Sequence, residues 1–321
     1  MILTVTLNPL LEHRLAYAVL HFGNENRNAK EIYKAGGKGI NVSRQLNLLS
    51  IDNIAYTFLG GNNGKLLKKV LSEEKINFTF VSTHSETRSS AIIIDESNST
   101  ITSCFGNDPP ISLAEAEEFK LKLEKMIQNC EIVVFSGSSP CDQANSIFPF
   151  GIYKANQYDK ISICDTYGIH LKDCIEASPT ILHNNIDEVE KSLKVSLRSE
   201  NEIIDHLKFL QSKNIKQAFI TDASNPTYAS NFEFIFKVEN PKVKTLDSTG
   251  SGDCFVSGII YGWHKNLPFE RTLEFASFLG AVNATKFEVC NVTLEEANSI
   301  KNKVEVIPFG KKMRSIDVKP T

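Results

Sequence analysis

The sequence predicts an α/β fold in which a doubly wound, mostly parallel sheet carries helices on both faces. Short, continuous apolar runs with strand character recur along the chain, and amphipathic helix-like stretches lie between several of them. Such alternation is typical of parallel strands that are buried on both sides. The length of 321 residues suits one large domain over 1–321 better than two independent cores.

The predicted strands are apolar and rich in β-branched residues. They span residues 2–7, 54–60, 131–137, 161–165, 180–185 and 216–222. The clearest helix-like stretches span 112–129, 199–213 and 268–287. In the first of these, Ser112 is placed to cap the helix, and apolar residues recur at helical intervals behind it.

Two segments interrupt this alternation. Residues 10–34 and 87–104 have extended character with little helical pattern, and "DESNS" at 95–99 is typical of a hairpin turn. We expect the two segments to form a small β lid over the functional site, and a homodimer could form through this lid. The polar C-terminal stretch 308–321 is predicted to be a surface tail.

Composition limits the classes of function. The net charge of −3 and the pI of about 6.2 do not favour a nucleic-acid or membrane-surface role, because both need a basic face. Seven cysteines form no C-x-x-C pair, which fits reduced thiols. The sequence shows neither a secretory signal nor an apolar run long enough to span a membrane. We therefore expect a cytoplasmic protein that binds small molecules.

A glycine-rich stretch, "TLDSTGSGDCFVSG" at 245–258, leads into an apolar helix-like run. It lacks the spacing of a dinucleotide fingerprint and of a P-loop. Backbone amides at a helix start bind anions, and glycines let a phosphate approach closely. Asp253 would repel a resting phosphate there, but it could activate a hydroxyl beside developing phosphoryl charge. From spacing alone, a structural N-cap turn and a catalytic site are equal alternatives.

A second glycine cluster, "KAGGKGINVSR" at 34–44, also precedes a helix-like stretch. Lys38 lies among three glycines, which suits contact with an anionic, phosphorylated ligand. Taken alone, such a cluster is more often an ordinary loop than a binding site.

Together, "GGKGINVSR" and "DSTGSGDCFVSG" resemble the two signatures of the ribokinase-like (PfkB) sugar kinases. The opening "TVTLNP" at 4–9 is similar to the branch that contains 1-phosphofructokinase and tagatose-6-phosphate kinase. Further landmarks of the family follow in order as "FLGGNNG", "ETR", "FSGSSP", "CDTYG" and "NIDE". The resemblance spans residues 2–290.

The resemblance implies roles for individual residues. Asp253 matches the catalytic base, and Gly250, Ser251 and Gly252 match an anion hole for the transferring phosphoryl group. The residues implied on the sugar side are Glu12, Arg27, Gly37, Lys38, Asn41 and Arg88. Among these, Lys38 and Arg88 would hold the phosphate already on the sugar.

The donor side is implied in the same way. The residues that match nucleotide-binding positions are Asn185, Glu188, Thr221, Ala223 and Asn283. Asn185 and Glu188 match an N-x-x-E pair that organises Mg²⁺ and its waters, and Mg²⁺ prefers oxygen ligands and retained water. The implied activity is ATP- and Mg²⁺-dependent phosphorylation of a ketohexose monophosphate, with fructose 1-phosphate expected as the acceptor. Tagatose-6-phosphate kinase activity is an alternative, and so is a non-catalytic sugar-phosphate or nucleotide sensor on the same fold.

Three stretches depart from the family's pattern. Glu12 stands where an aspartate is usual, and His183-Asn184 stands where Lys-Pro is usual. In the loop after the strand at 216–222, Ala223 and Pro226 replace glycines, and Pro226 has no N–H to offer a phosphate. The altered loop motivates the sensor alternative, whereas retention of Asp253 argues for catalysis.

Overall fold

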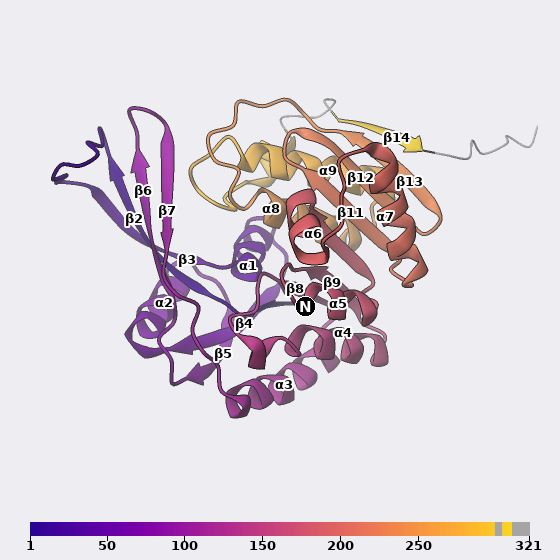
Figure 1. The fold of residues 1–321 in the computed structure, drawn as a ribbon, viewed down its shortest axis with the longest axis horizontal. Helices are drawn as coiled ribbons and strands as arrows, with labels where there is room; N and C mark the ends of the chain where they lie inside the picture. The colour runs from indigo at the N-terminus through magenta and orange to yellow at the C-terminus, as the bar shows by residue number, and fades with distance from the viewer. Residues whose placement is uncertain (299–303, 310–321) are drawn as a thin grey trace, which may run out of the picture.

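A ten-stranded sheet forms the centre of the molecule in the computed structural model, which describes residues 1–298 and 304–309 (Figure 1). The strand order is β14-β13-β12-β11-β10-β9-β8-β1-β4-β5, and the seven strands from β11 to β5 run parallel. These seven are β5 (Phe78–Thr83), β4 (Asn53–Gly60), β1 (Ile2–Thr6), β8 (Ile132–Ser136), β9 (Ile161–Asp165), β10 (Ile181–Asn185) and β11 (Gln217–Asp222). The six predicted strands are confirmed to within one residue at each end, and so is the predicted fold class.

Three antiparallel strands complete one edge of the sheet. They are β12 (Asn225–Asn231), β13 (Phe234–Glu239) and β14 (Glu305–Phe309). The predicted surface tail is wrong at its start, because Pro308 and Phe309 pair with β13. Residues 310–321 of that stretch lie outside the described part of the chain.

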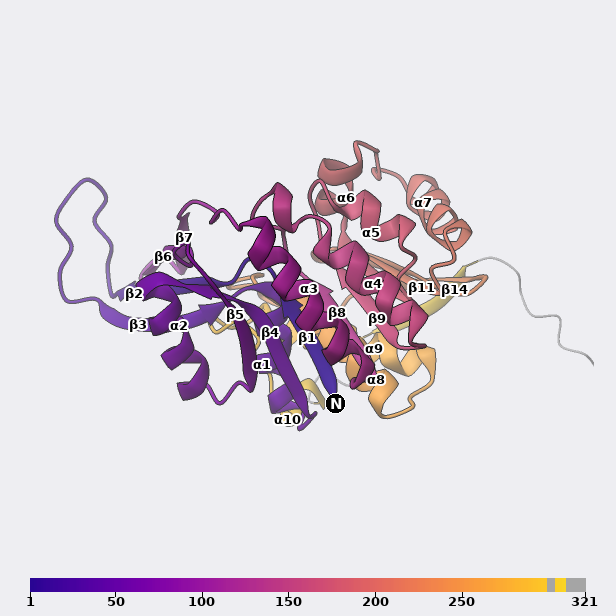
Figure 2. The same ribbon diagram turned by 90° about the horizontal axis from the view of Figure 1, so that it is seen from below.

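Helices cover both faces of the sheet (Figure 2). One face carries α1 (Lys38–Leu48), α2 (Gly61–Glu73), α8 (Ser251–His264), α9 (Phe269–Asn283) and α10 (Leu294–Asn298). The other carries α3 (Leu113–Gln128), α4 (Ile147–Gln157), α5 (Leu171–Glu176), α6 (Ile186–Leu193) and α7 (Glu200–Ser212). The two-residue period of a strand explains the arrangement, since Ile2 packs on the α1 side and Leu3 on the α3 side.

Local signals set the helix ends. The expected cap at Ser112 is observed as a reciprocal capping box with Glu115. The helix predicted over 268–287 ends at Asn283, because the chain turns there and the Thr285 hydroxyl donates to the Val282 carbonyl at 2.8 Å.

A separate four-stranded sheet of order β3-β2-β6-β7 projects from the main body, on the left in Figure 1. Its strands are β2 (Leu10–Tyr17), β3 (Lys30–Gly36), β6 (Ser89–Asp95) and β7 (Thr100–Phe105). They fall in the two segments predicted to form the lid, and the turn between β6 and β7 is the predicted "DESNS" hairpin. We call this sheet the lid.

The order of the strands in the sheet indicates which edge can bind a ligand. From β1 the sheet grows to β4 and β5 on one side, whereas β8 to β11 extend it on the other. The switch point therefore lies between β1 and β8, and ligands of open α/β sheets bind outside the carboxyl ends of the strands at such a point.

Candidate active site

The glycine-rich stretch at 245–258 forms the start of α8. Gly250 is the N-cap residue, and its φ of 77° lies in the left-handed region that glycine adopts without steric cost. A Cβ at this position would lie 2.3 Å from Val289 Cγ1, so the turn also needs glycine for space. The Ser251 amide donates to Ser248 O at 3.1 Å, and the next two amides, of Gly252 and Asp253, belong to the first turn, which lacks intrahelical acceptors.

Asp253 lies buried in this first turn, at 4% exposure. Its Oδ2 accepts a hydrogen bond of 2.8 Å from Nδ2 of Asn41, which stands in the first turn of α1. Burial, with a further contribution from the Asp165 carboxylate, raises the pKa of Asp253 to about 7, although Lys38 and Asn41 oppose the shift. A carboxylate with a pKa near neutrality is well matched to accept a proton.

Lys38 is the first residue of α1 and follows Gly37, whose φ is 116°. Its Nζ lies 2.6 Å from Oε1 of Glu188 and 3.2 Å from Oδ1 of Asp165. Although burial alone would lower it, these two carboxylates raise the pKa of Lys38, so the side chain is a permanent ammonium. The resemblance implied that Lys38 holds the phosphate of the sugar. In the structure it pairs instead with Asp165 and with Glu188, a residue expected to hold Mg²⁺.

Asn185 and Glu188 form the capping box at the start of α6. The Asn185 Oδ1 accepts from the Glu188 amide at 2.8 Å, and the Glu188 Oε2 accepts from the Asn185 amide at 3.1 Å. Nearby, the buried Oδ2 of Asp165 has no hydrogen-bond partner. No group of three or more His, Cys, Asp or Glu side chains in the described residues could enclose a metal ion. The oxygens present fit Mg²⁺ that keeps most of its waters, as this ion usually does.

His183, where the resemblance would place a lysine, links this cluster to α8. Its Nδ1 lies 2.9 Å from Oδ1 of Asp165, and its Nε2 lies 3.3 Å from Oγ1 of Thr221. Because Lys38 and His183 lower the pKa of Asp165 in spite of its burial, the carboxylate accepts and the imidazole Nδ1 donates. The ring stacks on Phe255 of α8 with centroids 5.3 Å apart, so His183 supports the start of that helix.

A second polar cluster surrounds Asn8, which lies two residues beyond the end of β1. The Arg88 guanidinium binds Asp108 through Nη1 at 2.9 Å and the Asn8 carbonyl through Nη2 at 3.2 Å. Asn8 Nδ2 also donates to Asp108 Oδ1 at 2.8 Å. The buried Nε of Arg88 and Oδ1 of Asn8 have no partner. The Asp108 carboxylate therefore occupies the Arg88 guanidinium, which could otherwise bind another anion.

The structure brings together only part of the predicted set. Asp253, Asn41, Lys38, Glu188 and Thr221 join through the contacts described above. Arg27 lies apart in the loop between β2 and β3, where it is 80% exposed and pairs with Glu25.

Asn283 is buried and contacts the glycine-rich turn at the start of α8. Its Nδ2 donates to Thr249 O at 2.8 Å and to Ser251 Oγ at 3.1 Å, and its Oδ1 accepts from the Cys290 amide. With both ends of its amide engaged, Asn283 is placed to brace the glycine-rich turn.

The loop expected to contact the nucleotide is a tight turn between β11 and β12. Ala223 adopts a φ of 45°, a conformation that glycine adopts more readily. Pro226 stands where the pairing of β11 with β12 changes register, so its missing N–H breaks no ladder hydrogen bond.

Sequence analysis assigned no role to Asp165, Asp108 or Arg44. Asp165 could have been found from its place directly after a predicted strand, at the edge where parallel strands present functional side chains. Asp108 carries no such signal, because its partners Asn8 and Arg88 are distant in sequence. Arg44 lies within the glycine-rich stretch at 34–44, but its ion-pair partner Glu74 is 30 residues away.

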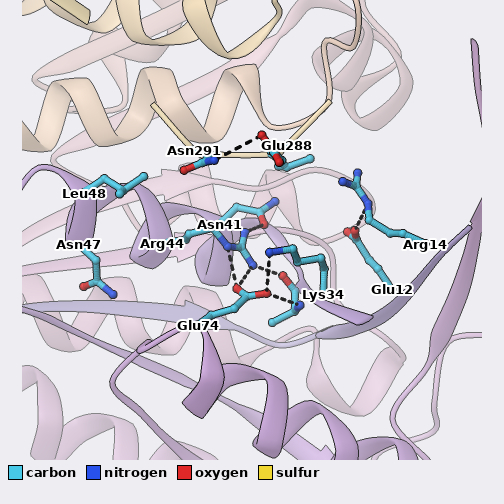
Figure 3. Close-up of a pocket in the computed structure, with 12 residues that line it drawn as sticks. Glu12, Arg14, Lys34, Asn41, Arg44, Asn47, Leu48, Glu74, Glu288 and Asn291 are labelled. Atoms are coloured by element: carbon cyan, nitrogen blue, oxygen red, sulfur yellow. Dashed lines mark hydrogen bonds and ion pairs between the residues drawn. The ribbon is translucent and has the colours of Figure 1, made fainter. Parts of the chain in front are cut away.

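A cavity of about 250 Å³ adjoins the predicted sugar-side residues between α1, the lid and the 288–291 loop (Figure 3). Glu12 and Asn41 line it together with Arg14, Arg44 and Glu74. Glu12 pairs with Arg14 Nε at 3.2 Å, and burial raises the pKa of this glutamate despite two neighbouring arginines. Asp253 is not among the residues that line the cavity, although its hydrogen-bond partner Asn41 is.

Comparisons with known proteins agree with this geometry. The model of the pfkB family of carbohydrate kinases matches residues 11–297. Tagatose-6-phosphate kinase of Staphylococcus epidermidis is 29% identical over 313 residues, which are 96% of this chain and 99% of that protein.

Solved structures share the fold. A possible 1-phosphofructokinase from Thermotoga maritima has a TM-score of 0.88 at 23% identity, over 96% of this chain and 99% of that one. Phosphofructokinase-2 from Escherichia coli in complex with potassium has a TM-score of 0.84 at 19% identity, over 93% and 97%. A tetrameric inhibited form of phosphofructokinase-2 is also similar, with a TM-score of 0.82 at 19% identity over 93% and 97%.

The fold and the family match together define a sugar-phosphate kinase, an enzyme that transfers a phosphoryl group to an alcohol. The chain belongs to the pfkB family of carbohydrate kinases. Sugar kinases of this family use ATP, generally with Mg²⁺. Within the described residues, no helix has the length and apolar character needed to cross a membrane.

Proposed function

We propose that this chain transfers the γ-phosphoryl group of ATP to a free hydroxyl of a ketohexose monophosphate, with Asp253 as the general base. The observation that carries the proposal is a buried carboxylate with a raised pKa in the first turn of α8, beside the amides of a glycine-rich helix start. A sensor that only binds phosphates would gain nothing from a carboxylate there, because it repels them.

The proposed reaction is a displacement at phosphorus. Asp253 accepts the proton of the sugar hydroxyl as the new O–P bond forms, and the bond between the γ-phosphorus and the bridging oxygen breaks, leaving its electrons on ADP. The amides at the start of α8 and the Lys38 ammonium stabilise the charge on the transferring group. Asn185, Glu188 and the unpartnered Asp165 oxygen would hold Mg²⁺ through water, and that ion would neutralise phosphate charge.

The acceptor is the finer part of the proposal. Fructose 1-phosphate, which would give fructose 1,6-bisphosphate, is favoured by the resemblance of "GGKGINVSR" to the 1-phosphofructokinase branch. Tagatose 6-phosphate is the second candidate, favoured by the 29% identity to a tagatose-6-phosphate kinase. Both acceptors carry a phosphate at one end and a primary hydroxyl at the other.

A coupled assay for ADP release tests the proposal. Comparison of kcat/KM for fructose 1-phosphate, tagatose 6-phosphate and fructose 6-phosphate assigns the acceptor. If no sugar phosphate stimulates ADP release while calorimetry still detects sugar-phosphate or nucleotide binding, the chain is a sensor and the catalytic proposal fails.

Arg88 is proposed to hold the phosphate already on the sugar. Arg88→Ala is expected to weaken binding of the phosphorylated acceptor by about 2 kcal/mol or more, because a partly buried guanidinium loses a charge-assisted contact. Binding of unphosphorylated fructose should hardly change. The matched control is Arg198→Ala, which removes an exposed arginine paired with Glu190. Equal losses for both sugars would instead make Arg88 a structural residue that orders Asn8 and Asp108.

The lid is proposed to pair two copies of the chain. It exposes Ile32 and Tyr33 on β3 and Phe105 on β7, apolar side chains that a partner subunit could cover. Ile32→Lys should convert a dimer to a monomer in sedimentation velocity, because a charge would be buried in the interface. Leu121→Lys, on the exposed face of α3, is the control. A wild-type monomer at micromolar concentration would refute this pairing.

A further inference from the structure

We infer that Arg44 is a positioning residue for the base, because it fixes the orientation of the Asn41 amide and so presents the NH₂ group to Asp253. The inference rests on the proposed role of Asp253 and extends it to a residue that lies outside the expected substrate contacts. It is built on a chain of hydrogen bonds that leads from Asp253 through α1 to the lid and α2.

The first step is the chemistry of the Asn41 side chain. An amide offers a donor and an acceptor of nearly the same shape, so its orientation depends on its partners. Asn41 Nδ2 donates to Asp253 Oδ2 at 2.8 Å, and Arg44 Nη1 donates to Asn41 Oδ1 at 2.8 Å. Arginine carries only donors, so the oxygen of the amide must face Arg44. The NH₂ group is thereby directed to Asp253.

The second step is that Arg44 is itself held firmly. Its Nε donates to Glu74 Oε2 at 2.8 Å, and its Nη2 lies 2.7 Å from the same oxygen. Nη2 also donates to the carbonyl of Ala35 in β3, and Glu74 accepts from the Ala35 amide at 3.2 Å. Both charged side chains are mostly buried. Figure 3 shows Arg44 between Asn41 and Glu74, with Lys34 beside Arg44 at the same carboxylate.

The third step concerns the base. A rotated Asn41 amide would place its carbonyl oxygen against the carboxylate of Asp253. Two acceptors at that distance repel unless the carboxyl is protonated, and a protonated Asp253 cannot accept the proton of a hydroxyl. With the NH₂ group in place, Oδ2 is occupied and the other oxygen is left for the substrate. Arg44 therefore favours the competent form of the base without touching the reacting atoms.

Helix geometry makes this arrangement natural. Asn41 and Arg44 are three positions apart on α1, so their side chains emerge on the same face. Arg44 also lines the cavity of about 250 Å³, which makes its place accessible to a small cation.

Chemical rescue of Arg44→Ala tests the inference. We expect kcat to fall about 100-fold, the loss expected when a catalytic group is misplaced by about 1 Å, while the KM values for both substrates change less than about threefold. Guanidinium at millimolar concentration should raise the kcat of the variant at least about tenfold, because it can bind where the arginine side chain was. Arg271→Ala is the matched control, because Arg271 forms an exposed pair with Glu274 on α9. It should neither lose kcat nor respond to guanidinium.

If Arg44→Ala does not fold, a second variant and a second measurement still test the inference. Arg44→Met combined with Glu74→Gln removes both members of the buried pair, and among the described residues the only charge that loses its partner is Lys34, which is 34% exposed and lies 3.9 Å from Glu74 in the wild type. In this variant kcat should also fall, and the side-chain amide protons of Asn41 should lose their distinct, slowly exchanging NMR signals. A kcat within threefold of wild type, or a loss of kcat with unchanged Asn41 signals and no rescue, would overturn the inference. If wild-type protein phosphorylates no sugar phosphate, the proposed function fails, and the Asn41 signals alone decide the role of Arg44.

Discussion

Replacing Asp253 by asparagine is expected to lower kcat by about 10²–10⁴-fold, the usual contribution of a general base. The isosteric amide keeps the contact with Asn41 but cannot accept a proton from the sugar hydroxyl. The KM of the acceptor should change little, because the carboxylate acts on the hydroxyl and not on the phosphate of the sugar. A loss of kcat above this range would mean that the substitution also disturbs the amides at the start of α8, which are proposed to bind the transferring phosphoryl group.

The pH dependence gives an independent check on Asp253. Its pKa of about 7 means that the base becomes protonated as the pH falls through neutrality, so kcat/KM should fall on the acidic side with an apparent pKa near 7. The raised pKa of Asp253 also makes the free energy of unfolding depend on pH. The folded state binds the proton more tightly than the unfolded state, so the carboxyl contributes stability at low pH that is lost as the pH rises through 7.

Asp253→Asn should therefore raise the melting temperature at pH 8 while it abolishes most activity. Asp205→Asn, at an exposed position on α7, is the control and should change neither property. Near-normal turnover in Asp253→Asn, or a wild-type profile that is flat between pH 6 and 8, would refute the assignment of the base.

Replacing Lys38 by methionine is expected to lower kcat by about 10²–10³-fold, the range for loss of a single preorganised donor to developing charge. The ammonium lies among the carboxylates of Asp165, Glu188 and Asp253, and it lowers the pKa of Asp253. Its loss should therefore also move the acidic limb of the pH profile to higher pH. Measurement of kcat/KM between pH 6 and 9 checks both effects.

The split between kcat and KM decides which phosphate Lys38 serves. If it acts on the transferring group, kcat falls and the KM of the sugar phosphate is nearly kept. If the KM for phosphorylated sugars rises while kcat is retained, Lys38 instead binds the phosphate already on the sugar, as the family resemblance implies. Lys191→Met is the control, because Lys191 forms an exposed pair with Asp187 on α6. Melting temperatures identify any loss that reflects misfolding.

Much of the fold could be predicted because its signals are local. Buried parallel strands need continuous apolar runs, so six strands were located to within one residue. Glycine at 250 is required by a left-handed φ and by the closeness of Val289, and this need is visible as a glycine-rich motif. The position of the candidate base could be located for the same reason, because Asp253 and the amides around it lie within a few residues, although its role was implied only by the family resemblance.

The tertiary structure alone decided how distant residues share charge and orientation. Lys38 pairs with Glu188 across 150 residues and Asn41 with Asp253 across 212, so no local pattern could show either pairing. The burial of Asn283 and the exposure of Arg27 depend likewise on how the whole chain packs. Hydrogen-bond orientation and pKa are set by all the groups surrounding a side chain, and only the folded chain brings those groups together.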